Sequence, residues 1–157
     1  MTLSAFQSSP SPRRVPARLV VGVALILVAT APAGAVDLEV RVEGVAAPLG
    51  RVGCSLFGSD AGFPMDNSRA QQQWQPARAD GVVCRFEGLP PGRYAVSIGH
   101  DRNGNQRVDT NLLGLPTEQW GVSNNVRPRL RAPRFEEAVF TIPADAAAWA
   151  VTIRVAS

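Results

Sequence analysis

The chain of 157 residues contains no lysine, one histidine, one tyrosine and only two cysteines. Without lysine, the protein cannot form a lysine Schiff base and cannot contain a phosphate-binding loop of the G-x-x-x-x-G-K type. The same absence excludes a Lys–Asn isopeptide crosslink. A hydrolase of the Ser-His-Asp kind would have to use His100, the only histidine. These absences leave few catalytic options.

The N-terminal segment has the three parts of a secretory signal peptide: a positive region, an apolar region and a small-residue cleavage signal. These are Arg13, Arg14 and Arg18, then residues 19–28, then Ala33-Gly34-Ala35. Thr30 and Pro32 end the apolar run before the roughly 20 residues that a membrane-spanning helix needs. We therefore expect a signal peptide at residues 1–35, cleaved after Ala35. Retention as a membrane anchor is the alternative.

Residues 36–157 are expected to form one secreted or periplasmic domain that has no membrane span after cleavage. All 16 basic residues are arginine, and three of them fall in the signal segment, which leaves 13 arginines against 13 acidic residues. A domain this close to neutral lacks the broad positive face of nucleic-acid-binding proteins. We expect a monomer with an envelope or extracellular partner of unknown identity and no nucleic acid.

Alternation of apolar and polar residues predicts an all-β domain. Six or seven strands are expected, six of them near residues 38–43, 52–57, 82–86, 94–99, 137–142 and 149–155. Turn residues between them favour an antiparallel β-sandwich. Two long connections, residues 58–81 and 101–136, interrupt the pattern. In the first, Asp66, Asn67 or Ser68 is expected to cap a helical turn that carries Ala70 and Trp74 on one face and ends before Pro76.

The two cysteines, Cys54 and Cys84, lie in the inward register of two predicted strands. Exported proteins fold in an oxidising compartment, so a disulfide between them is expected. Two buried free thiols are the alternative.

Oxygen-bearing side chains alternate in the second long connection, as in loops that bind Ca²⁺. The candidate ligands are Asp101, Asn103, Asn105, the Arg107 carbonyl, Asp109 and, from further along the chain, Glu118. Compared with an EF-hand loop, Leu112 replaces the bidentate glutamate and Gln106 replaces the usual glycine. The sequence therefore predicts at most a weak Ca²⁺ site. The alternative is that these residues only cap turns.

Other residues of this region could contact a ligand. They are His100, Trp120, Ser123, Asn124 and Asn125, with Trp74 as a second aromatic platform. The tryptophans could stack on sugar or peptide, or they could pack the loops onto the core. His100 shares the inward register of Tyr94, whereas Asp101 turns away, which is a poor geometry for a catalytic triad. Tyr94 is expected to bond to nearby backbone, as a tyrosine-corner residue does.

A string of short motifs resembles the secreted bacterial family called domain of unknown function 2141. The motifs are FEGLPPGRYAV at 86–96, HDRNGN at 100–105, DTN at 109–111, GLPTE at 114–118, GVSNN at 121–125 and PRFEEA at 133–138. The resemblance covers about residues 37–155, and the chain departs from the usual pattern at Gln106 and Thr117. It implies an immunoglobulin-like or transthyretin-like sandwich of six to eight short strands, with no established activity.

These observations favour an exported, non-enzymatic domain with a binding or structural role in the cell envelope and a polar loop that is a candidate for weak Ca²⁺ binding. A carbohydrate- or peptide-binding adhesion module is the first alternative. A hydrolase that uses His100 is the second.

Overall fold

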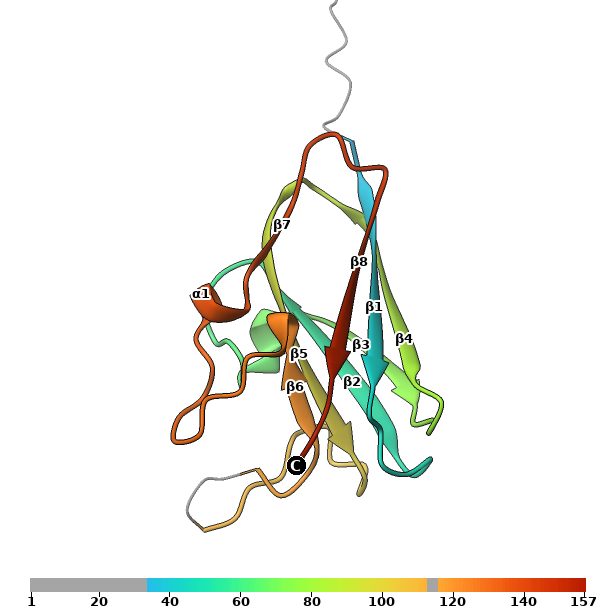
Figure 1. Ribbon diagram of the computed structural model, residues 1–157, viewed down its shortest axis with the longest axis vertical. Coiled ribbons are helices and arrows are strands. Elements are labelled where there is room, and N and C mark those ends of the chain that lie inside the picture. The colour runs from blue at the N-terminus through green and yellow to red at the C-terminus, as the bar shows by residue number, and fades with distance from the viewer. Residues whose placement is uncertain (1–33, 113–115) are drawn as a thin grey trace, which may run out of the picture. The chain divides into compact units, whose positions relative to one another are not determined.

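Alternating apolar residues build two β-sheets in the computed structural model, which describes residues 34–112 and 116–157 (Figure 1). The predicted signal peptide, apart from Gly34 and Ala35, lies outside the described residues. The elements are β1 (Val36–Glu43), β2 (Arg51–Phe57), η1 (Asn67–Arg69), β3 (Gln71–Pro76), β4 (Val82–Leu89), β5 (Gly92–Asp101), β6 (Trp120–Val122), η2 (Ser123–Asn125), α1 (Phe135–Ala138), β7 (Phe140–Ile142) and β8 (Ala148–Arg154). No helix in the described part of the chain is long and apolar enough to cross a membrane.

One sheet has the order β4-β1-β8, and the other has the order β3-β2-β5-β6 with β7 also paired to β5. The all-β sandwich predicted from the sequence is confirmed. It is not purely antiparallel, because β1 and β8 run parallel over Asp37–Glu43 and Ala148–Arg154. Antiparallel pairing was expected from the tight turns between neighbouring strands, but β1 and β8 are far apart in the sequence and no turn joins them.

The main core lies between the two sheets and follows the predicted inward register. Val40 of β1, Val52 of β2 and Ile98 of β5 are almost fully buried there. The predicted disulfide is confirmed: Cys54 of β2 and Cys84 of β4 are bridged. Because these strands belong to different sheets, the bridge links the two layers through the core.

A second, smaller cluster covers part of the other face of the five-stranded sheet. Phe57 and Ala95 point away from the main core, and the rings of Phe63 and Phe135 close over them. The Phe57–Phe63 and Phe63–Phe135 ring pairs are edge-to-face, with centroids 5.3 Å and 5.8 Å apart. The first long connection is therefore anchored to the sheet by Phe63.

Two local predictions were right only in part. Asp66 caps a helical turn, accepting the Ser68 N–H at 3.2 Å, but the turn is limited to η1, and Trp74 lies in strand β3 rather than on a helix. Pairing with β2 takes up residues 71–76 and so overrides their helical pattern. The strand expected at residues 137–142 begins only at Phe140, because α1 occupies Phe135–Ala138 and packs into the second cluster.

The expected tyrosine contact is confirmed. The hydroxyl of Tyr94 donates to the carbonyl of Pro90 at 2.8 Å and fixes the turn that precedes β5. Burial raises the pKa of this hydroxyl.

Candidate functional site

The polar segment after β5 is a loop that its own buried carboxylates hold closed. We call it the Asp/Asn loop and define it as residues 102–112 and 116–119. Asp101, at the end of β5, is 1% exposed. One oxygen, Oδ1, accepts the N–H groups of Gly104 and Asn105 at 2.7 and 3.2 Å, and Oδ2 accepts that of Gln106 at 2.7 Å. A single carboxylate therefore caps three successive amides of the turn.

Glu118 closes the other end of the Asp/Asn loop. It is buried, and its two oxygens accept the N–H groups of Arg102 at 2.9 Å and Asp109 at 3.0 Å. The N–H of Thr117 donates to the Asp109 carbonyl at 2.7 Å. Glu118 thus joins the outgoing and returning arms of the loop, and its predicted role as a Ca²⁺ ligand stays a prediction.

Asp109 has different partners from the two buried acids. Its carboxylate oxygens accept the side-chain amides of Asn103 and Asn105, each at 2.6 Å. The side-chain oxygen of Asn103 accepts the backbone N–H of Asn105 at 3.1 Å, and the side-chain oxygen of Asn105 accepts that of Arg107 at 3.0 Å. Every candidate side-chain ligand therefore accepts an N–H bond within the loop. This agrees with the turn-capping alternative, and the Ca²⁺ site stays a prediction.

Gln106, at the position where an EF-hand loop has glycine, has a left-handed backbone conformation. Its φ is 62°, in the left-handed region that glycine adopts without steric cost. The Asp101 bond to its N–H holds it in place. Across residues 34–112 and 116–157, no group of three or more His, Cys, Asp or Glu side chains is placed to hold a metal ion.

His100 is buried, as its register predicted, and it tethers two loops. Its Nε2 lies 2.8 Å from the Leu49 carbonyl, and its Nδ1 lies 3.1 Å from Oε1 of Gln119. The same Gln119 amide accepts the Ala46 N–H at 2.8 Å and donates to the Gly44 carbonyl at 2.9 Å. Gln119 was missed by the sequence analysis, because nothing near it in the sequence marks a residue whose partners lie 73 and 75 positions away.

The Ser123-Asn124-Asn125 triplet joins strands and α1 through backbone groups. Ser123 is fully buried, accepts the Val96 N–H at 3.0 Å and donates to the Ala138 carbonyl. Asn124 donates to the Val139 carbonyl at 2.9 Å. Asn125 accepts the Arg154 N–H at 2.7 Å. The structure gives these polar groups a structural role, and their contact with a ligand stays a prediction.

Trp74 of β3 and Trp120 of β6 both pack against the domain. Arg127 lies over Trp120, with its guanidinium carbon 4.3 Å from the ring centroid, and it donates to the Ala156 carbonyl at 3.0 Å. Burial lowers the pKa of Arg127. The Trp74 ring lies on β2, where a Cβ added to Gly53 would come within 2.7 Å of Trp74 Cη2.

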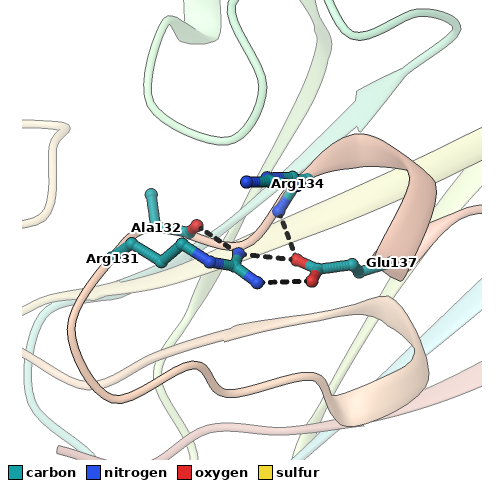
Figure 2. A network of polar contacts seen from close by, with 4 residues as sticks. All are labelled: Arg131, Ala132, Arg134 and Glu137. Carbon is teal, nitrogen blue, oxygen red and sulfur yellow. Dashed lines mark hydrogen bonds and ion pairs between the residues drawn. The ribbon is translucent and has the colours of Figure 1, made fainter.

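An arginine-rich segment, residues 127–134, is connected to α1 by a network of polar contacts (Figure 2). Arg131 donates to both carboxylate oxygens of Glu137, at 2.8 and 2.6 Å, and the Arg134 N–H donates to the same carboxylate at 2.9 Å. The bonds from Arg131, followed by the bond from Arg134, lower the pKa of Glu137 from the usual 4.5 to about 2. This network connects the arginine segment to the start of α1.

Replacing Glu137 with glutamine should lower the melting temperature at pH 7 and leave it unchanged at pH 2. The folded-state pKa lies below the unfolded value, so this carboxylate stabilises the fold above about pH 4.5 and loses that effect as the pH falls toward 2. Thermal unfolding of Glu137→Gln and the unchanged protein at several pH values measures the difference. The exposed Asp145→Asn is the control. A difference in melting temperature that does not change with pH would contradict the view that the ionised Glu137 carboxylate stabilises the fold.

A hollow of about 390 Å³ lies on the outward face of the five-stranded sheet, next to the Asp/Asn loop. Its floor residues are Gly53, Ser55, Ser97 and Gly99, and its walls include Pro64, Met65, Asn67, Trp74, Arg107, Val108, Asp109 and Thr110. The sequence analysis missed this site except for its loop residues and Trp74. The available signal was the small residues in the outward register of two predicted strands.

The comparison with protein families found one match, to a family described as uncharacterised proteins conserved in bacteria, DUF2141, over residues 40–149. No curated protein and no solved structure matches the chain. The matched range runs from β1 to β8 and includes the Asp/Asn loop and the floor of the hollow. The chain therefore belongs to the DUF2141 family, as its motifs indicated.

Proposed function

We propose that this protein is an exported, non-enzymatic domain that binds a component of the cell envelope at the hollow beside the Asp/Asn loop. The observation that carries the proposal is that hollow, because it combines a sheet floor with a loop wall held by Asp101 and Glu118. Ligand sites of this kind are concave and largely preformed, with a few polar groups.

Export is supported by where the first strand of the described residues begins. Strand β1 starts at Val36, the residue that cleavage after Ala35 would make the first of the mature chain. The disulfide also fits an oxidising compartment.

A binding role is favoured over hydrolysis by the partners of the acid and histidine side chains. The carboxylates of Asp101 and Glu118 accept backbone N–H groups, and both ring nitrogens of His100 contact oxygen atoms of neighbouring residues. A general base must reach the proton that it removes from a substrate. We expect no hydrolysis of generic ester substrates, and hydrolysis that is lost in His100→Ala would support the enzymatic alternative.

Sedimentation with washed envelope fragments tests the proposed function. The purified protein should pellet with the fragments in a saturable way. The variant Asp101→Ala, which loses the cap of three loop amides, should pellet less. A β-sandwich protein of similar net charge serves as the control. Protein that stays in the supernatant at every fragment concentration, or that pellets no more than the control, would overturn the proposal.

Weak Ca²⁺ binding is a second candidate property, favoured by one observation on Asp109. Its carboxylate is bonded to two side-chain amides, which can rotate, whereas Asp101 and Glu118 are bonded to backbone. A cation would therefore displace the amides of Asn103 and Asn105 and use their carbonyl oxygens.

Calcium at about 1 to 10 mM should raise the melting temperature, and a chelator should reverse the rise, because extracellular modules bind this ion in the 10⁻⁴ to 10⁻³ M range. The variant Asp109→Asn should lose the response. The measurement is thermal unfolding with CaCl₂ or with chelator at constant ionic strength. Equal melting temperatures under both conditions would leave turn capping as the sole role of these residues.

A further inference from the structure

The floor of the hollow is built from small residues on two neighbouring strands. Gly53 pairs with Gly99, and Ser55 pairs with Ser97, across β2 and β5. All four alternate with core-facing residues, so they face outward. A Cβ at Gly99 would lie 2.7 Å from Cγ2 of Val108, just as a Cβ at Gly53 would contact Trp74. The two glycines therefore let a loop residue and an aromatic ring lie directly on the sheet.

Ser55 supplies an unpartnered hydroxyl in this floor. The residue is 4% exposed and lines the hollow, and its side chain has no hydrogen-bond partner among residues 34–112 and 116–157. Its oxygen is not among the solvent-shielded atoms without a partner, so the hydroxyl is open to the hollow. It can therefore donate to or accept from a group that enters the hollow.

Asn67 supplies a second unpartnered group. Its side-chain oxygen has no hydrogen-bond partner in the described part of the chain, and the residue lines the same hollow. This oxygen is shielded from solvent, so the carboxamide would have to rotate to bring it to a ligand. Arg107 is a lining residue from the Asp/Asn loop, and its guanidinium has no partner among the described residues. Ser97 donates to the Pro64 carbonyl at 3.0 Å, so its oxygen can still accept a bond.

Charge at the hollow is mixed, because the guanidinium of Arg107 lines it together with the carboxylates of Asp101 and Asp109. The Asp101 carboxylate already accepts three backbone N–H groups of the loop. A strongly anionic ligand would meet the Asp109 carboxylate, and a strongly cationic ligand would meet the Arg107 guanidinium. Hydroxyl groups both donate and accept, so they match a lining that contains a free hydroxyl, a free carboxamide and both charged groups. The Trp74 ring adds an apolar surface that suits the C–H face of a sugar ring.

A second hollow adjoins the first. Pro64, Met65, Ser97 and Val108 also line a second hollow of about 570 Å³ that reaches Trp120. Both volumes fall in the range of small-molecule sites, about 300 to 1,000 Å³. A chain-like ligand could therefore extend from Trp74 toward Trp120 along the outward face of the sheet.

We propose that this hollow is an oligosaccharide-binding site in which Ser55, Asn67 and Arg107 bond to sugar hydroxyls and Trp74 contacts a sugar face. The proposal rests on the binding function proposed above and names its ligand class.

Titration calorimetry of the purified protein with cellotriose, maltotriose and chitotriose tests this site, with trialanine and inorganic phosphate as comparison ligands. At least one trisaccharide should bind at concentrations below about 10 mM. Ser55→Ala and Asn67→Ala should each weaken that binding at least about tenfold, because each removes one polar partner. Ser59→Ala, an exposed serine outside the hollow, is the matched control and should bind like the unchanged protein. Melting temperatures identify any variant that fails to fold. If Ser55→Ala fails to fold, Ser55→Thr, which keeps the hydroxyl, is measured in its place and should retain binding.

The proposal is overturned if none of the three trisaccharides binds, if only trialanine or phosphate binds, or if the Ser55 and Asn67 variants bind a trisaccharide as well as the control does. Envelope sedimentation separates this failure from failure of the broader function. Protein that pellets with envelope fragments but binds no trisaccharide would keep the binding function and remove its carbohydrate ligand.

Discussion

Replacing both Cys54 and Cys84 with alanine should lower the free energy of unfolding by about 3 to 4 kcal/mol, the value that the chain-entropy model gives for a loop of this size. The bridge spans 30 positions of sequence and links β2 to β4. Its loss therefore increases the conformational entropy of the unfolded chain and removes the covalent link between the two sheets. A loss of this size should lower the melting temperature by about 10 °C. Urea unfolding of the variant and of the unchanged protein measures the difference.

Reduction of the unchanged protein provides the control, because it breaks the same bond without removing side-chain atoms from the core. It should reproduce most of the loss. If the alanine variant is much less stable than the reduced protein, the difference reports the cavity left by the two sulfur atoms. A variant within about 1 kcal/mol of the unchanged protein would show that the bridge contributes little to stability.

Replacing Asp101 with alanine should lower the free energy of unfolding by about 2 to 4 kcal/mol, because three backbone N–H groups lose a charged acceptor that is almost fully buried. The loss should open the Asp/Asn loop, which faster amide hydrogen exchange at Gly104, Asn105 and Gln106 would report. Urea unfolding gives the free energy, and exchange measured by NMR identifies the amides.

Asp109→Ala is the matched control in the same loop. Its carboxylate is bonded to two exposed side-chain amides rather than to buried backbone, so its loss should cost less than about 1 kcal/mol. Equal losses in the two variants would contradict the view that Asp101 closes the loop. Unchanged exchange at the three amides in Asp101→Ala would contradict it as well.

Features with a short sequence period were predictable in this protein. The alternation of Leu38, Val40 and Val42 placed β1 and its core face correctly, and the same reasoning put Cys54 and Cys84 within bonding distance. The Tyr94 contact was predictable because its partner, Pro90, lies only four positions away. In each case the sequence pattern itself specifies which face of a strand a side chain occupies.

Prediction failed where distant segments determine the local structure. Trp74 lies in a strand because β2 offers a free edge to pair with, and nothing within residues 66–76 encodes that edge. The parallel pairing of β1 with β8 joins segments more than 100 residues apart. Short strands such as β6 and β7 depend on their partner β5 and contain too few residues to show a period.

At the candidate site, the sequence by itself determined the Asp/Asn loop, its family and its oxygen-rich composition. Only the tertiary structure decided how those oxygens are used, because Asp101 and Glu118 accept N–H groups that become neighbours when the loop closes. It also decided that Gly53, Ser55, Ser97 and Gly99 form one floor, since they come from two strands about 40 positions apart. The physical reason is that composition and spacing fix which groups are available, whereas hydrogen bonds and hollows require the relative placement of strands that only packing provides.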